Sequence, residues 1–404
     1  MKEHNSTIGA DPQQSDWRAE WSLRPGVTYL NHGSFGPSPL KVMAARREWI
    51  ERLESNPVDF LTRQLDELML NARRRLASFV GTTGDNLVYV DNATAGMNVV
   101  ASSITLQPGD EVLAADHDYG AVLRIWERKC KQSGAHLVVC NLPSPLTTPE
   151  QLADAFLAGV TPRTRLLVFS HVTSSTAVVL PAEMLCQRAR ALGLPICIDG
   201  PHALAMLDVD LPKLDCDYYT ASCHKWLCGP FGTGFLYVHP RAQQSIQPAV
   251  LSWGRTPLRA ATMNPDEPIV WTDEFTWSGT RDPSAYLAVP TAVEFMESVG
   301  LDFFRQRTHE MAQRAREQLA ATTKTAPLTP DSRDWYASMV AIPLDINFAQ
   351  GIALRKALWE EYRIEVPIFE WQDQRILRVS CHLYNRWEDI ERLLTALRMT
   401  LPKL

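Results

Sequence analysis

The stretch Tyr218-Tyr219-Thr220-Ala221-Ser222-Cys223-His224-Lys225-Trp226 carries a β-prone, apolar run directly into a lysine, and the glycine-rich turn Gly229-Pro230-Phe231-Gly232-Thr233-Gly234 follows. A lysine at the end of a buried strand, against such a turn, is poorly explained as a solvated surface charge. Desolvation and neighbouring cations lower the pKa of a lysine and make its amine a nucleophile that can form a Schiff base. The stretch therefore predicts a functional Lys225.

Outward from this stretch, short β-prone runs alternate with helical stretches. Strands are expected at residues 87–90, 111–114, 136–139, 166–169, 196–198 and 218–221, with helices between most of them, as at 150–157 and 182–192. This alternation predicts a largely parallel sheet with helices on both faces. Ligands of such sheets bind at the carboxyl ends of the strands, so the residues that follow each strand are candidates for a site.

Polar residues follow these strands. Asn92-Ala93-Thr94 opens a helix after the first strand, where its backbone N–H groups and the Thr94 hydroxyl can hold a phosphate, although a plain N-cap explains the same residues. Asp199 ends the fifth strand, and a buried carboxylate there needs a partner such as a protonated ring nitrogen. His202, one turn further on, fits either a core histidine or a hydrogen-bond partner of the same ligand. Together with Lys225, these residues match the needs of pyridoxal phosphate.

Composition sets outer limits on the class of protein. The 404 residues are enough for one or two domains, and a net charge of -6 gives no electrostatic case for nucleic acid or an anionic membrane. The polar first fifteen residues are expected to form a disordered arm, and neither a signal peptide nor a membrane-spanning run is recognisable. The eight cysteines lack the spacing of a zinc site or a disulfide framework, which indicates a reduced, cytoplasmic protein.

Ordered motifs run through nearly the whole chain. They are Tyr29-Leu30-Asn31-His32-Gly33-Ser34-Phe35-Gly36, Asn92-Ala93-Thr94, His117-Asp118-Tyr119-Gly120-Ala121-Val122, Ser222-Cys223-His224-Lys225, Gly279-Thr280-Arg281-Asp282, Ile364-Glu365-Val366-Pro367 and Leu377-Arg378-Val379-Ser380. In these motifs the chain resembles the class V, fold-type-I pyridoxal-phosphate enzymes, and within them the isopenicillin N epimerase-like family. The resemblance implies an α/β fold with a large, mainly parallel sheet domain of the seven-stranded type and a smaller C-terminal α+β domain. It also implies a homodimer that shares its active sites between subunits.

The expected organisation is a flexible arm at residues 1–20, a large cofactor-binding domain at 21–282 and a small domain at 283–404. Residues 21–60 are expected to lie near the active site. In the small domain, helices are expected at 284–297, 301–319, 351–362 and 386–399, with a strand at 339–342. Asn385 is expected to cap the last helix.

The resemblance also implies roles for individual residues. Lys225 would hold the cofactor and move protons at the substrate α-carbon, Asp199 would pair with the pyridine nitrogen, and His202 would approach the ring hydroxyl. Tyr119 would lie over the cofactor ring and act in catalysis, with His117 as the alternative. The other implied cofactor residues are Thr94, the backbone of Ala95, Ser222 and His224 at the phosphate, Gly279 and Thr280 at the phosphate of the neighbouring subunit, and Thr173 or Ser174 near the ring hydroxyl.

Arg378 would grip the substrate α-carboxylate through a bidentate pair, a geometry that lysine cannot copy. Asn31 and His32 are expected in the same substrate-binding region. From the residues alone, Arg378 also fits a surface position, because the alternation of Leu377 and Val379 indicates burial of their own face of the strand.

These residues predict chemistry at the α-carbon of an amino acid and leave its outcome open. A cysteine desulfurase needs a nucleophilic cysteine upstream of the carboxylate-binding arginine, but residues 326–377 contain no cysteine, and Cys381 is expected to be structural. Epimerisation needs a second proton donor, for which Tyr119 and His32 are candidates. β-Elimination needs only Lys225 and a leaving group, so the predicted activity is carbon–sulfur cleavage of a cysteine conjugate. The alternatives are an epimerase or racemase, a class V aminotransferase, a decarboxylating deaminase, and a binding protein without turnover.

Overall fold

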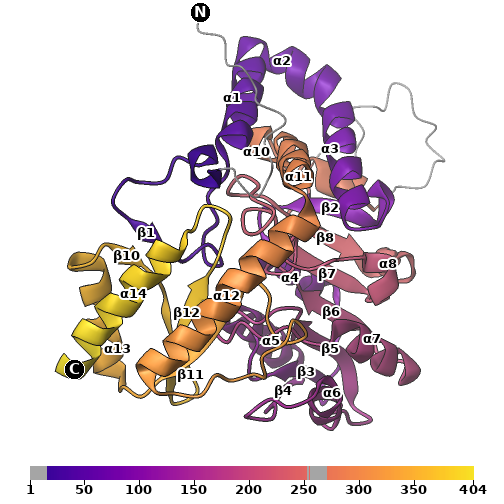
Figure 1. Cartoon of the computed structure of the whole chain (residues 1–404). Helices are drawn as coiled ribbons and strands as arrows, with labels where there is room; N and C mark the ends of the chain where they lie inside the picture. The colour runs from indigo at the N-terminus through magenta and orange to yellow at the C-terminus, as the bar shows by residue number, and fades with distance from the viewer. Residues whose placement is uncertain (1–15, 253, 255–270) are drawn as a thin grey trace, which may run out of the picture.

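A seven-stranded sheet forms the centre of the computed structural model, which describes residues 16–252, 254 and 271–404 (Figure 1). The expected disorder of residues 1–15 lies outside the described residues. The strands are β2 (Leu87–Val90), β3 (Glu111–Ala115), β4 (His136–Cys140), β5 (Thr164–Ser170), β6 (Ile196–Asp199), β7 (Tyr218–Ser222) and β8 (Gly234–Val238), in the order β2-β8-β7-β6-β5-β3-β4. β8 runs antiparallel to both of its neighbours, and the other pairs are parallel. The predicted mainly parallel sheet is confirmed, whereas β8 was not among the predicted strands.

Helices cover both faces of this sheet, which explains why its strands are continuously apolar. In β5, Leu166 and Val168 join one core together with residues of α4 (Ala93–Ser103) and α5 (Gly120–Ser133). The alternate residues Leu167 and Phe169 join the other core together with residues of α6 (Pro149–Leu157) and α7 (Ala182–Ala191). A strand buried on both faces needs apolar residues at every position, so the period-two pattern disappears.

A smaller C-terminal part, in orange and yellow, lies beside the seven-stranded sheet (Figure 1). Its three-stranded antiparallel sheet has the order β11 (Ile368–Trp371), β12 (Gln374–Ser380), β9 (Met339–Leu344). Its helices are α10 (Ser284–Leu287), α11 (Val289–Val299), α12 (Leu301–Thr323), α13 (Phe348–Glu360) and α14 (Trp387–Thr400). The predicted pairing of a large α/β sheet with a smaller α+β part is confirmed, and the limits at residues 20 and 282 stay predictions.

The N-terminal segment contacts this C-terminal part in two places. The short strand β1 (Thr28–Tyr29) pairs in parallel with β10 (Ile364–Glu365). The helices α1 (Leu40–Ser55) and α3 (Leu65–Phe79) pack on α10 and α11, and the short helix α2 (Pro57–Asp59) and a π-helical turn (Phe60–Gln64) connect α1 to α3. Within the described part of the chain, no helix combines the length and the apolar character that crossing a membrane requires.

Asn385 does not cap the last helix, because α14 begins one residue later than predicted and Arg386 is its N-cap. Instead, the Asn385 side chain accepts a hydrogen bond from the backbone of His382 at 2.9 Å and donates one to the carbonyl of Tyr29 at 2.9 Å. The asparagine therefore joins the N-terminal segment to the chain that follows β12.

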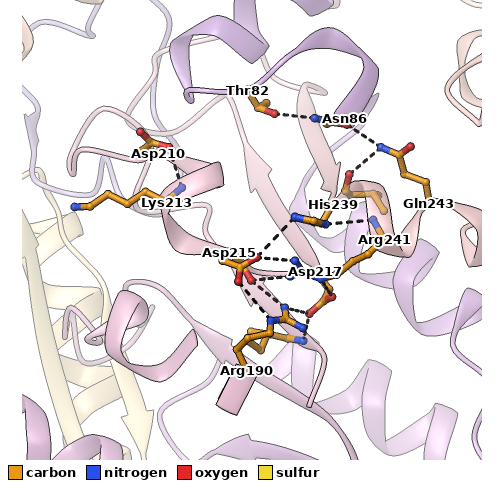
Figure 2. A network of polar contacts seen from close by, with 12 residues as sticks. Thr82, Asn86, Arg190, Asp210, Lys213, Asp215, Asp217, His239, Arg241 and Gln243 are labelled. Atoms are coloured by element: carbon orange, nitrogen blue, oxygen red, sulfur yellow. Dashed lines mark hydrogen bonds and ion pairs between the residues drawn. The ribbon is translucent and has the colours of Figure 1, made fainter. Parts of the chain in front are cut away.

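An ion-pair network closes the opposite end of β6 and β7, away from the strand ends that carry the predicted site (Figure 2). Asp217 is its buried centre: one carboxylate oxygen accepts hydrogen bonds from Arg190 at 2.8 Å and from the Ile196 backbone at 2.9 Å, and the other accepts one from Arg241 at 2.6 Å. Asp215 pairs with the same two arginines. Because these residues lie in α7, in β6, in the segment just before β7 and in the 3₁₀ helix Pro240–Ser245, the network joins these elements at that end of the sheet.

Candidate active site

A cavity of about 540 Å³ lies at the carboxyl ends of the parallel strands, where the sequence predicts a site. Eight of the predicted residues line it, namely Thr94, Tyr119, Ser174, Asp199, His202, Ser222, His224 and Lys225. They come from the carboxyl ends of β2, β3, β5, β6 and β7, which lie at one edge of the sheet. β3, β5, β6 and β7 pair in parallel, and β2 runs in the same direction because β2 and β7 are both antiparallel to β8. The volume suits a ligand of the size of a substituted pyridine joined to an amino acid.

Lys225 lies in the turn after β7, with its amine facing the cavity. The Lys225 Nζ is 3.1 Å from His202 Nε2, and the Lys225 carbonyl accepts hydrogen bonds from His32 Nε2 at 3.0 Å and from the Cys228 backbone at 2.8 Å. Burial and, second, the positive charge of Arg378 lower the pKa of Lys225 to about 7, while Asp199 acts in the opposite direction. A neutral, nucleophilic amine is therefore available near pH 7.

Asp199 is the last residue of β6 and is buried at the wall of the same cavity. Its Oδ1 accepts a hydrogen bond of 3.4 Å from the Thr220 hydroxyl on the neighbouring strand. Burial raises the pKa of Asp199 to about 7, although the charge of Lys225 favours ionisation. Within the described residues Asp199 forms no ion pair, so its carboxylate lacks the partner that a protonated ring nitrogen would provide.

The amino end of α4 forms another wall of the cavity. The Asn92 side chain accepts a hydrogen bond from the Ala95 backbone at 2.9 Å, and the Ala93 backbone donates to the Ser222 hydroxyl at 3.0 Å. Asn92 is thus an N-cap, and the turn that it begins also lines the cavity, so the two explanations of this turn are compatible. His224 lines the cavity too, and its buried Nδ1 has no hydrogen-bond partner within the described residues. A helix amino end beside an unpartnered ring nitrogen fits a phosphate group.

Arg378 lies directly behind the cavity wall. Its guanidinium donates to the Ser174 carbonyl at 2.6 Å and to the Ser34 hydroxyl at 2.8 Å, and it lies 4.8 Å from the Phe369 ring centroid. These three contact residues line the cavity. Arg378 is fully buried, burial lowers its pKa to about 9, and it has no carboxylate partner within the described residues. A buried guanidinium without a counter-ion can bind a carboxylate that enters the cavity.

The surface position considered for Arg378 is wrong. Nearly all of β12 is buried, because Leu377 and Val379 pack in the core while the opposite face closes against the N-terminal loop and Ser174. Asn31 supports this closure, since its Oδ1 lies 3.5 Å from an Arg378 nitrogen. Asn31 does not itself line the cavity.

His32 is also buried behind the cavity rather than in its lining. Its Nδ1 lies 2.9 Å from the Tyr384 hydroxyl, and its Nε2 holds the Lys225 carbonyl. Burial lowers the pKa of His32 to about 3. Gly36 allows this approach, because a Cβ atom there would lie 2.7 Å from His32 Nε2 and 2.8 Å from the Lys225 carbonyl oxygen. His32 is thus placed to position the lysine turn.

His32, His382 and Cys228 place two ring nitrogens and a sulfur within 4.8 Å of one another. The two imidazoles, however, are stacked, with 3.9 Å between centroids and 14° between planes. Because an imidazole ligand directs its lone pair within the ring plane, two stacked rings cannot aim at one metal ion between them. The cluster is therefore a packing arrangement rather than a metal site.

Of the residues left as alternatives, Tyr119 and Ser174 border the cavity. His117 is buried against Trp371, with 4.3 Å between ring centroids, and its Nδ1 lies 2.8 Å from the Thr176 hydroxyl. Thr173 is buried and shares a hydrogen bond of 2.7 Å with Thr176. Gly279 and Thr280 lie outside the lining of this chain's own cavity.

Several lining residues were not predicted as site residues, namely Ser34, Phe35, Asn92, Ala93, Val172, Pro201 and Phe369. Asn92 could have been found from its N-cap position, and Ser34 and Phe35 from their place in the glycine-punctuated loop. Phe369 carries no such signal, because it reaches the cavity only through the packing of β11 against the large sheet.

The chain is similar to several known proteins in sequence and fold. A family model described as aminotransferase class-V matches residues 28–393. An isopenicillin N epimerase from Amycolatopsis lactamdurans is 39% identical over 387 residues, which cover 94% of this chain and 97% of that protein. A probable chloroplastic L-cysteine desulfhydrase from Arabidopsis thaliana is 28% identical over 401 residues, covering 92% and 82%. The solved structure of the cystine C-S lyase C-DES with its product cysteine persulfide has a TM-score of 0.79 at 22% identity, covering 93% of this chain and 98% of that chain.

Proposed function

Because the chain belongs to the class-V aminotransferase family of pyridoxal-phosphate enzymes, we propose that it cleaves the carbon–sulfur bond of a cysteine-derived amino acid by β-elimination. The observation that carries this proposal is a lysine amine with a pKa of about 7 in a cavity that no cysteine of the described residues lines. Elimination needs that one base and a leaving group, and sulfur leaves readily. The desulfhydrase and C-S lyase among the similar proteins are consistent with this choice.

The residues of the cavity fit pyridoxal phosphate. Asp199 would hold the ring nitrogen in its protonated form, and the amino end of α4 with Ser222 and His224 would hold the phosphate. His202 would face the ring hydroxyl, and Tyr119 would cover the ring. When bound, the cofactor supplies an electron sink that acidifies the hydrogen on the substrate α-carbon.

The protein side of the reaction then follows from Lys225 and Arg378. Arg378 would bind the α-carboxylate and hold the α-hydrogen toward the Lys225 Nζ, which removes it as a proton. The Cβ–S bond breaks with its electron pair on sulfur, and the thiolate leaves and takes up a proton. In balance, a cysteine conjugate and one water give a thiol, pyruvate and ammonia, with no net oxidation or reduction.

A persulfide route through a protein cysteine has no support. All eight cysteines are free thiols, and Cys381, three residues after the substrate-binding arginine, is fully buried with a pKa raised to about 12. A thiol in that state is not a nucleophile near pH 7. Free thiols throughout also agree with a reduced, cytoplasmic setting, which we retain as part of the proposal.

Epimerisation is the second candidate, and one specific observation favours it. The protein with 39% identity is an isopenicillin N epimerase, and Tyr119, which is 46% exposed, offers a second proton donor at the cavity. Epimerisation would require Lys225 and Tyr119 to act on opposite faces of the α-carbon.

The two candidates separate in one experiment. Purified holoenzyme is incubated with L-cysteine and with S-alkyl and S-aryl cysteines, and pyruvate, ammonia and free thiol are measured, with Lys225→Ala as the inactive control. We expect the three products in equal amounts from at least one conjugate. Absence of pyruvate and thiol with every conjugate would refute the elimination. Deuterium uptake from D₂O at the α-carbon with inversion of an L-amino acid would instead establish an epimerase.

We further propose a homodimer in which Gly279 and Thr280 reach the phosphate site of the partner. Thr280 is exposed and does not line the cavity of its own chain, and α1 exposes Leu40, Met43 and Ile50 at its surface. Light scattering tests the assembly. Co-expression of Lys225→Ala with Thr280→Asp tests the shared site, because only a mixed dimer then contains one intact site; no recovered activity would contradict the sharing.

A further inference from the structure

Trp226 follows Lys225 directly and contacts the catalytic lysine through an intermediate histidine. Its indole Nε1–H donates a hydrogen bond of 3.4 Å to His202 Nδ1. The other ring nitrogen of His202, Nε2, lies 3.1 Å from Lys225 Nζ. Trp226 is fully buried and does not line the cavity, so neither the sequence motifs nor the cavity identifies it as part of the site. A three-residue chain of hydrogen bonds nevertheless ends on the reactive amine.

The direction of each hydrogen bond in this chain follows from the first. An indole N–H only donates, so His202 Nδ1 must present its lone pair to Trp226. A neutral imidazole then carries its proton on Nε2. The Nε2–H can donate to Lys225 Nζ only if that nitrogen has a free lone pair, which an ammonium group lacks. The arrangement therefore pairs the Nε2–H tautomer of His202 with the neutral amine of Lys225.

We propose that Trp226 is a positioning residue that holds His202 in the Nε2–H tautomer and thereby favours the neutral, nucleophilic form of Lys225. With cofactor bound, His202 would be the residue that faces the ring hydroxyl, as in the proposed function. The significance for catalysis rests on the proposed function, whereas the tautomer itself rests only on the hydrogen bonds.

The charged neighbours are consistent with a neutral His202. Burial and then the positive charges of Lys225 and Arg378 lower the pKa of His202 well below 6.5, and His32 and His224 add to this. Asp199 is the acidic group that acts on Lys225, where it favours the protonated amine and thus opposes Trp226. His32 already donates its Nε2–H to the Lys225 carbonyl, which can only accept.

Packing is the competing explanation for a buried tryptophan at this position, because the Trp226 ring lies 5.0 Å from the His32 ring. Trp126 provides a matched control. It is equally buried, belongs to the core on the other side of the sheet, and donates its indole N–H to the sulfur of Met97 at 3.3 Å. Trp126→Phe thus removes one buried indole N–H without touching His202.

The first test measures the apparent pKa of Lys225. Full-length wild type, Trp226→Phe and Trp126→Phe are freed of cofactor, and the rate of pyridoxal phosphate capture is recorded from pH 6 to pH 9. Without the indole donor, His202 can accept from the lysine ammonium, so we expect Trp226→Phe to raise the apparent pKa by about 0.5 to 1 unit. Capture near pH 6.5 then slows about 3- to 10-fold and converges with wild type at high pH. An unchanged profile in Trp226→Phe, or an equal shift in Trp126→Phe, overturns the proposal.

The second test needs no tryptophan variant to fold. Nitrogen-15 histidine spectra of the full-length wild type report the tautomer of each imidazole, and the His202 signal is assigned by its loss in His202→Gln. We expect the proton on Nε2, and a proton on Nδ1 overturns the proposal. Neither test involves substrate, so both outcomes are independent of whether the enzyme cleaves a carbon–sulfur bond.

Discussion

Replacing Asp199 by asparagine should raise the free energy of unfolding of the cofactor-free protein and lower its affinity for pyridoxal phosphate. Burial raises the pKa of Asp199 from 3.8 to about 7. Between these values the unfolded chain is ionised while the folded protein keeps the proton, so the stability falls as the pH rises and the full penalty applies above about pH 7. At about 1.4 kcal/mol per pH unit, this difference corresponds to about 4 kcal/mol.

Asparagine has the shape of aspartate and removes this penalty. Asp199 also favours the protonated amine of Lys225, but that amine has a pKa of about 7 and is mostly neutral at pH 8. Removal of Asp199 therefore gives back little free energy there, and we expect a net gain in the free energy of unfolding of about 2 to 4 kcal/mol at pH 8. With cofactor bound, wild type should be more stable than Asp199→Asn, because asparagine cannot keep the pyridine nitrogen protonated.

Equilibrium urea unfolding of the cofactor-free protein at pH 8, 6 and 4.5 measures the effect, and the affinity for pyridoxal phosphate is measured in parallel. We expect the advantage of Asp199→Asn to shrink toward pH 4.5 and its cofactor affinity to fall. Asp208→Asn, at a side chain that is 92% exposed, controls for the substitution itself. The reasoning is refuted if Asp199→Asn is less stable than wild type at pH 8, or if the difference does not depend on pH.

Three further substitutions test other contacts. Arg378→Lys should lower kcat/KM about 100-fold in steady-state kinetics, because an ammonium cannot form the bidentate pair, and a change below threefold would contradict its role. Gly36→Ala should destabilise the protein by about 1 to 3 kcal/mol in urea unfolding and slow cofactor capture, since its Cβ meets His32 and the Lys225 carbonyl; wild-type capture would contradict that close approach. Asp217→Ala should lower the free energy of unfolding by about 2 to 3 kcal/mol in urea unfolding, because two partly exposed arginines lose their buried partner (Figure 2). Its kcat/KM should stay within twofold of wild type, because the network lies away from the cavity.

The fold was largely predictable because short, continuously apolar β-prone runs alternate with helical stretches along the chain. Runs such as residues 166–169 are apolar at every position, which is typical of a strand with helices on both faces. β8 (Gly234–Val238) is not predicted from the sequence, because it directly follows the glycine-rich turn after Lys225 and has no helix before it to mark it as a separate strand. Its antiparallel pairing with both β2 and β7 is a tertiary choice that no local pattern reports.

The cavity was predictable where it is built from strand ends. Thr94, Asp199 and His202 lie at or just after the carboxyl ends of strands that run in the same direction. They therefore share one edge of the sheet with Lys225, independently of the loop conformations. The motif around His32 predicts that it binds the substrate. In the structure, His32 does not line the cavity and instead contacts the carbonyl of Lys225. A motif records which residues occur in the loop, whereas burial and hydrogen-bond partners decide which side of it faces the cavity.

The sequence alone determined that the chain builds a mainly parallel sheet and that a lysine and an aspartate meet at its carboxyl edge, because the periods and the strand ends are local properties. Only the tertiary structure decided that Arg378 is buried behind Ser34 and Ser174, and that the indole of Trp226 reaches His202. These contacts depend on how distant elements pack. These tertiary contacts also set the tautomer of His202 and thereby the protonation of Lys225. The reason is that a hydrogen bond has a donor and an acceptor, and the spacing of residues in the sequence does not show which atom donates.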